Sequence, residues 1–131
     1  METPERRRSR RVRPLVAEPV RVELRCGEGR APLVLDAVDI AIHGVGFQAT
    51  ANQLQALEPE LGIDAEFFLP GQSERLGIPV EIRQRRQLGD LVHLGLEFAF
   101  EDAEQKDWAS AHLASYVSER LAGERQVGRA A

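Results

Sequence analysis

The sequence predicts an all-β domain, an antiparallel sandwich or barrel, that ends in a single helix. Apolar and polar residues alternate with a period of two in several short stretches between residues 20 and 98. Turn-forming glycine, proline and aspartate residues separate these stretches. After residue 100 the apolar period changes to that of a helix. Because no long helix lies between the strands, a closed antiparallel sheet without exposed edges is the expected architecture.

The first two predicted strands differ in their pattern. Between residues 20 and 26 apolar residues alternate strictly with charged ones, which indicates a strand with one face in water. A glycine-rich loop follows at residues 27–30. Residues 33–38 are apolar on both faces, so this strand should be covered on both sides or lie at a barrel seam, and Asp39 should close it.

Four further strands alternate in the same way, and together they bring the predicted count to six. A short crossing segment at residues 52–61 is expected after the first of them, with Pro59 limiting any helical turn. Pro70 and Gly71 mark a turn, and residues 87–90 form a hairpin connection. The four strands are expected at residues 44–51, 65–69, 78–83 and 91–98.

A C-terminal helix is predicted over residues 101–121 and should pack on the barrel. Asp102 is placed to cap its first turn. Its apolar stripe has residues four apart, namely Ala109, Leu113, Val117 and Leu121. The chain is therefore divided into a flexible arginine-rich arm, residues 1–18, a barrel with its helix, residues 19–121, and a flexible tail, residues 122–131.

Charge is distributed unevenly along the 131 residues. Six of the seventeen basic residues lie between Arg6 and Arg13, so a basic arm is joined to an acidic body. Arginine presents a planar fork that suits phosphate groups and the acceptor edge of guanine. No apolar run is long enough to cross a membrane, and the N-terminus lacks the apolar block of a secretory signal, so we expect a cytoplasmic protein.

The sequence does not favour catalysis. His43, His93 and His112 fall in a turn, a strand and a helix without the spacing of a metal site, and no cofactor is expected. Cys26 is the only cysteine, which excludes an intramolecular disulfide, and it lies in phase with the apolar face of its strand. No serine has the context of an activated nucleophile. We therefore expect a binding protein rather than an enzyme.

Two short motifs suggest what is bound. Residues 38–48 read as a strand, a tight turn and a second strand, with Asp39 before the turn and Gly44 and Gly46 after it. Upstream, Arg7 and Arg11 have the spacing Arg-x-x-x-Arg. Together they resemble the signatures of the PilZ family, Arg-x-x-x-Arg followed by Asp/Asn-x-Ser-x-x-Gly. Ala41 stands where the family usually has serine.

The resemblance covers most of the chain and implies a six-stranded PilZ-like β-barrel that binds cyclic di-GMP (c-di-GMP). Arg7 and Arg11 would contact phosphates and the O6/N7 edge of guanine, and Asp39 would accept from the guanine N1 and N2 donors. Gly44, with Gly46 beside it, would permit close backbone approach, and Ala41 would occupy the serine position of the site. Arg6 and Arg10 have the same spacing, so the arginine register stays open by one residue, and Arg6 is included among the ligand-binding candidates.

Three functions follow in order of preference. The first is a c-di-GMP receptor whose arm becomes ordered over the barrel and changes a surface for an unidentified downstream protein, acting as a monomer or dimer. The second is a PilZ-like protein-interaction adaptor, for example in type IV pilus assembly, with weak or no c-di-GMP binding, to which the missing serine hydroxyl points. The third, binding of a nucleic acid polymer, is disfavoured by the acidic body and by aromatic residues that lie in core phase.

Overall fold

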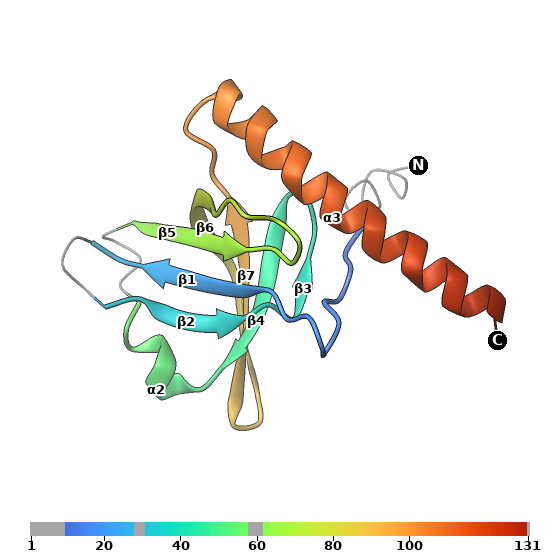
Figure 1. Ribbon diagram of the computed structural model, residues 1–131. Helices are drawn as coiled ribbons and strands as arrows, with labels where there is room; N and C mark the ends of the chain where they lie inside the picture. The colour runs from blue at the N-terminus through green and yellow to red at the C-terminus, as the bar shows by residue number, and fades with distance from the viewer. Residues whose placement is uncertain (1–9, 28–30, 58–61, 131) are drawn as a thin grey trace, which may run out of the picture.

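The computed structural model describes residues 10–27, 31–57 and 62–130, and shows one curled antiparallel sheet beside a long helix, α3 (Figure 1). Seven strands follow one another in the sheet in the order β2-β1-β5-β6-β7-β4-β3. A four-residue helix, α2, connects β4 to β5. The bounds are β1 Arg21–Arg25, β2 Leu33–Asp36, β3 Asp39–Ile40, β4 Gly44–Ala49, α2 Ala51–Leu54, β5 Ile63–Phe68, β6 Leu76–Leu88, β7 Leu91–Phe98 and α3 Ala103–Ala130.

The sheet closes where β2 passes into β3. The amide of Ala37 donates to the carbonyl oxygen of Val20, beside β1, at 2.9 Å, and the amide of Val38 donates to that of Gly46, on β4, at 2.8 Å. Two consecutive residues thus bond opposite ends of the strand order and bring the sheet around into a barrel. The predicted antiparallel barrel class is confirmed, and the predicted seam at residues 33–38 lies at this closure.

The structure has one strand more than the six predicted. Asp39 does not end the preceding strand, because β2 stops at Asp36 and the chain crosses the seam before a new strand begins. Asp39 and Ile40 form the separate strand β3, which pairs with β4. The other strands occupy the predicted stretches, and β6 is longer than expected.

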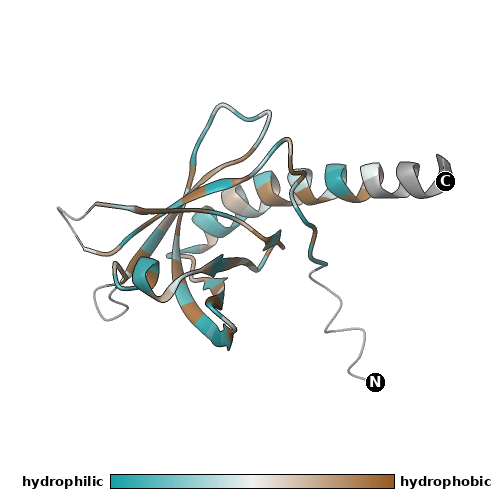
Figure 2. Ribbon diagram, turned by 90° about the horizontal axis from the view of Figure 1, so that it is seen from below, coloured by the Kyte–Doolittle hydropathy of each residue, from teal (hydrophilic) through white to brown (hydrophobic). Residues whose placement is uncertain are grey.

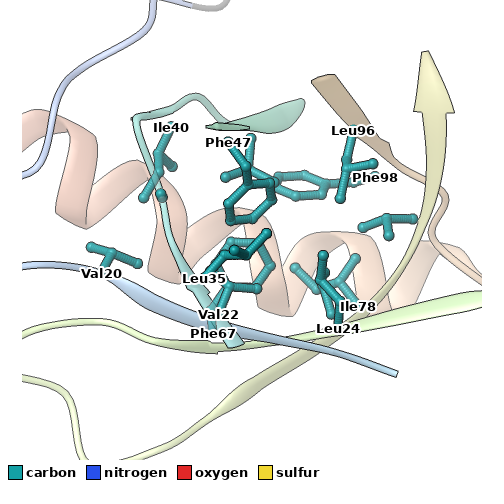
Figure 3. Packing of buried hydrophobic residues seen from close by; sticks show 14 of the residues in the cluster. Val20, Val22, Leu24, Leu35, Ile40, Phe47, Phe67, Ile78, Leu96 and Phe98 are labelled. Carbon is teal, nitrogen blue, oxygen red and sulfur yellow. The ribbon is translucent and has the colours of Figure 1, made fainter. Parts of the chain in front are cut away.

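The core lies between the inner face of the sheet and α3, and its residues are those that the alternating patterns predict. Phe47 and Phe67, from β4 and β5, are fully buried, and the rings of Phe67 and Phe98 meet edge to face at a centroid distance of 5.6 Å. Figure 3 shows these rings among aliphatic side chains from the surrounding strands. Cys26 is also buried, in agreement with the phase of its strand.

Strands β6 and β7 form a long hairpin that turns at Gly89, where φ is +62°. Only the first part of β6, up to Val80, pairs with β5. Beyond it the strand pairs with β7 alone among the described segments, and a bulge shifts the register between Ile82 and Gln84. On its other side β7 pairs with β4 from Val92 to Glu97, so only the tip of the hairpin, at residues 88–91, extends beyond the neighbouring strands (Figure 1).

Helix α3 begins as predicted and ends later than predicted. The carboxylate of Asp102 accepts a hydrogen bond from the amide of Gln105 at 2.7 Å, the geometry of an N-cap. The expected stripe packs on the barrel, with Leu113 fully buried. The helix continues to Ala130, through the residues expected to form a tail, and its C-terminal half extends past the sheet (Figures 1 and 2). No described helix is both long and apolar enough to cross a membrane.

Part of the predicted flexible arm is packed on the barrel. Val12 is 2% exposed and belongs to the core. Its amide and carbonyl exchange two hydrogen bonds of 2.9 Å with those of Ile40, so the arm adds an antiparallel bridge outside β3. At the next residue of the arm, the carbonyl oxygen of Arg13 accepts a hydrogen bond of 2.9 Å from the guanidinium of Arg120 on α3. The arm from Arg10 onward is thus held between the barrel edge and the helix.

Candidate functional site

The predicted turn between Asp39 and Gly46 is a tight hairpin connecting β3 to β4. The amide of Ala41 donates to the carbonyl oxygen of Gly44 at 2.9 Å, which closes the turn. His43 is exposed at the tip, and the side chain of Ala41 is fully buried. The methyl group at the family's serine position therefore lies beneath the surface and presents no atom to solvent.

Asp39 and Gly46 lie opposite each other in the β3–β4 ladder. A Cβ atom built on Gly46 would lie 2.8 Å from the Asp39 Oδ1 atom, which is closer than side-chain carbons approach. The carboxylate thus occupies the space that glycine leaves open. The Gly46 position determines where the Asp39 side chain rests.

Gly44 is required for a different reason. A Cβ atom built there would lie 2.4 Å from the carbonyl oxygen of Leu96 on the neighbouring strand β7. Backbone atoms in a paired strand cannot move aside, so any other residue would displace the strand. The structure gives Gly44 a packing role that does not depend on a ligand.

The arm brings its arginine to the carboxylate. Arg11 Nη1 donates to Asp39 Oδ1 at 2.7 Å, and the two side chains are 53% and 22% exposed. The bridge between Val12 and Ile40 fixes the backbone beside this pair. Residues predicted from two motifs 28 positions apart are therefore in contact. Arg6 and Arg7 lie outside the described residues.

Sequence reasoning missed a row of residues that continues across the sheet from Asp39. Residues directly opposite each other in adjacent strands point to the same face. Gly46 pairs with Gly95 on β7, and Gly95 pairs with Gln84 on β6, so this row is level with Asp39. One row further along the strands on the same outer face come Gln48, His93 and Arg86.

This outer face is polar, whereas the face behind it forms the core. Phe47 and Leu94, which alternate with the outer residues, are fully buried. Gln48 and Arg86 are exposed and His93 is half-buried. The register that aligns them includes the bulge in β6, which the sequence pattern does not reveal. Hydrophobic alternation alone placed His93 outside without indicating its neighbours.

A separate hollow of about 550 Å³ lies between the β5–β6 loop and α3. Its lining includes Glu74, Glu119 and His112, and none of the predicted ligand-binding residues. The His112 Nδ1 atom lies 2.8 Å from the Gln72 Oε1 atom across it. Among the residues that the structure describes, no group of histidine, cysteine and acidic side chains is arranged to hold a metal ion. The predicted site is an open surface at the barrel edge.

The PilZ domain model matches residues 5–119 of the chain, from the arginine-rich arm to the helix. The chain belongs to the PilZ domain family. The match includes both motifs and the turn that contains Ala41. The fold described above, a barrel closed at β2–β3 with a C-terminal helix, is thus the PilZ fold.

Solved PilZ structures resemble this chain in fold at low sequence identity. The PilZ domain of YcgR from Escherichia coli, solved with c-di-GMP, is 17% identical with a TM-score of 0.64, over 92% of this chain and 97% of that one. MrkH of K. pneumonia in complex with c-di-GMP is 15% identical with a TM-score of 0.65, over 86% of this chain and 52% of that one. The Bacillus subtilis inhibitor of motility MotI/DgrA is 13% identical with a TM-score of 0.61, over 88% and 51%.

This PilZ chain spans about half the length of MrkH and of MotI/DgrA, and nearly the whole length of the isolated YcgR domain. Comparison with curated protein sequences gives no match. The structural likeness therefore establishes the fold, and the binding chemistry has to be argued from the residues of this chain.

Proposed function

We propose that this PilZ protein is a receptor for cyclic di-GMP. The observation that carries the proposal is the contact between Arg11 and Asp39, which unites the two PilZ motifs at one edge of the barrel. A guanidinium and a carboxylate side by side offer complementary groups to guanine and phosphate. The YcgR and MrkH structures with c-di-GMP have the same fold and support this choice of ligand.

In the proposed complex each motif residue has one task. Asp39 accepts hydrogen bonds from the N1 and N2 donors of one guanine, and Arg11 contacts a phosphate or the O6/N7 edge. Because Arg11 is half-exposed and bonded to Asp39 by one nitrogen, its other donors are available to the ligand. Binding needs no covalent chemistry. It needs a fixed carboxylate and a movable cation.

The arm is the proposed switch. Val12 is buried and bridged to β3, so the anchored segment does not have to be ordered by the ligand. The segment before Arg10, which contains Arg6 and Arg7, is the part that we propose closes over the bound dinucleotide. The bond from Arg120 to Arg13 supports transmission of this change to α3, and we propose that a downstream protein recognises the altered surface.

A protein-interaction adaptor is the second candidate, and Ala41 favours it. A serine hydroxyl at this position would contribute roughly 0.5–1.5 kcal/mol through one hydrogen bond. Because the Ala41 side chain is fully buried, a hydroxyl there would act on the turn beneath the ligand. Its absence weakens c-di-GMP binding by up to about tenfold on this reasoning and does not abolish it.

Isothermal titration with c-di-GMP, using GTP as the control ligand, tests the receptor proposal. We expect saturable binding by the wild-type protein that GTP does not reproduce. Asp39→Ala and Arg11→Ala should each weaken binding by about tenfold or more, because each loses charge-assisted hydrogen bonds.

The chain offers a matched control for the ion pair itself. Arg25 bonds Glu23 on β1, and the exposures of these two side chains, 51% and 22%, nearly equal those of Arg11 and Asp39. Arg25→Ala removes the same charge from the same kind of pair and should leave affinity within about twofold. A flat titration of folded wild-type protein would reject the receptor and leave the adaptor.

A further inference from the structure

We infer that the c-di-GMP site extends from Asp39 across the outer face of β4, β7 and β6, and that Arg86 and His93 contact the half of the ligand that Asp39 does not reach. The inference rests on the proposed function and assigns residues outside both PilZ motifs. It follows from four strands whose registers are continuous on one face of the sheet.

Two glycines adjoin next to Asp39, and the Asp39 carboxylate lies over the first of them, Gly46. Gly46 and Gly95 face each other across β4 and β7 and place no side chain between Asp39 and Gln84. The Gln84 side chain leans toward Gly95, since a Cβ atom built on Gly95 would lie 3.7 Å from the Gln84 Oε1 atom. A planar base fits over such a backbone surface, with the Gln84 amide at its far edge.

An arginine lies on each side of the glycine surface formed by Gly46 and Gly95. One of the two is already paired with carboxylates, and among the described residues the other is not. Below it, Arg83 is engaged by Glu97 and Glu81. Above it, Arg86 lies opposite His93, and its side chain makes no ion pair or hydrogen bond with any described residue. Arg86 is exposed on the outer face. It is therefore a free cation on the same face as the Asp39 carboxylate.

The spacing suits a ligand with two bases and two phosphates. Adjacent strands are about 4.8 Å apart, so three strand intervals separate Asp39 from Gln84 by about 14 Å, and Arg86 lies two residues further along β6. A mononucleotide seated at Asp39 would end over the glycines. A cyclic dinucleotide brings a second phosphate and guanine into the range of Arg86 and His93.

Arg85 provides the matched control for this assignment. It is adjacent in sequence, equally charged and exposed, and its side chain likewise makes no ion pair or hydrogen bond with a described residue. It lies opposite Leu94, which is buried, so Arg85 points to the other face of the sheet. Arg85→Ala and Arg86→Ala each remove one positive charge from the protein. Only Arg86 faces the proposed ligand.

The test is calorimetric titration of c-di-GMP into the full chain and into Arg86→Ala, His93→Ala and Arg85→Ala, with GTP titrated in parallel. We expect Arg86→Ala to weaken c-di-GMP binding by about tenfold and Arg85→Ala to change it less than about twofold. His93→Ala should weaken binding severalfold. Equal melting temperatures would exclude an effect on folding.

A fourth substitution tests the glycine surface without altering charge. Gly95→Val inserts a side chain into the gap beside Gln84 while keeping a residue favoured in strands. We expect it to weaken binding by about tenfold or more. Wild-type binding that is lost in Asp39→Ala and unchanged in Arg86→Ala and Gly95→Val would overturn the extended site and preserve the receptor. Absence of wild-type binding would overturn both.

Discussion

Arg11 and Asp39 are 28 residues apart in sequence, and the nitrogen of one lies 2.7 Å from the oxygen of the other. The contact depends on Val12, the next residue after Arg11, which is buried and bridged to Ile40, the next residue after Asp39. In each of the two segments a surface residue, Arg11 or Asp39, is followed by a core residue, Val12 or Ile40. The predicted recognition pair is therefore positioned by the same short ladder that anchors the arm.

Substitution of Gly46 should affect the site more than the fold. In Gly46→Ala the new Cβ atom would approach Asp39 Oδ1 to 2.8 Å, and the carboxylate, which is 22% exposed, would swing away. We expect affinity for c-di-GMP to fall by about tenfold, since the guanine loses its acceptor. The free energy of unfolding should change by less than about 1 kcal/mol. Titration and urea unfolding of the same sample measure both.

Substitution of Gly44 should affect the stability of the fold more than the site. The Cβ atom of Gly44→Ala would lie 2.4 Å from the backbone carbonyl oxygen of Leu96, which β-sheet pairing holds in place. We expect the free energy of unfolding to decrease by about 2 kcal/mol or more through overpacking. Urea unfolding of Gly44→Ala beside Gly46→Ala gives the comparison, and equal stability of the two variants would contradict these separate roles.

Shortening Val12 should weaken both the fold and the site. Val12→Ala removes two buried methyl groups and leaves a small cavity, which costs about 2 kcal/mol of stability. Because Arg11 is the neighbour of Val12 in the chain, loosening of Val12 also displaces Arg11, and we expect a several-fold loss of c-di-GMP affinity. Val16→Ala is the control, since Val16 is 99% exposed in the same segment. A Val12→Ala variant as stable as the wild type would show that burial of the Val12 side chain contributes little.

The stability of the protein at alkaline pH should depend on the ionisation of Tyr116, the only tyrosine of the chain. Burial raises its pKa above the ordinary value of 10.0, while Arg120 lowers it and Glu18 raises it by smaller amounts. A raised pKa means that the neutral phenol is favoured in the folded state. Its contribution is present below pH 10 and is lost as the pH rises through the higher folded pKa.

Tyr116→Phe should remove this dependence. We expect the variant to match the wild type within about 1 kcal/mol at neutral pH and to be the more stable of the two at about pH 11. Melting temperatures across this range test the expectation, and tyrosinate absorbance follows the ionisation directly. Parallel curves for the two proteins at alkaline pH would contradict it.

Residue pattern was sufficient for the barrel class, for most strands and for the start of the helix. The two-residue period of Val20, Val22 and Leu24 reports burial on one face, and the position of Asp102 reports a cap, so both are local signals. The seam between β2 and β3 is not local. In the sequence, Ala37 and Val38 look like a continuation of the strand. Their two hydrogen-bond partners, near opposite ends of the sheet, impose the change of direction, and the local pattern does not reveal these partners.

The candidate site divides in a similar way between local motif spacing and non-local strand register. Arg11, Asp39 and Gly46 stand in motifs whose spacing is visible in the sequence, and the structure places them together. Arg86 and His93, which we propose as further ligand contacts, belong to no motif, and their position relative to Asp39 depends on three strand registers and on a bulge. The helix was predicted too short since Gly123 and the polar residues after it resemble a helix end, whereas α3 continues to Ala130.

The unequal lengths of β5 and β6 leave a stretch of strand with open hydrogen-bonding groups. From Glu81 to Leu88 no described segment pairs with the outer edge of β6. Such an edge is a template for sheet growth between molecules. Arg83, Arg85 and Arg86 occupy it, and alignment of two such edges would set cation against cation. Repulsion between these arginines thus opposes self-association of the barrel through this edge. Replacing them by threonine or valine would promote fibrous aggregates.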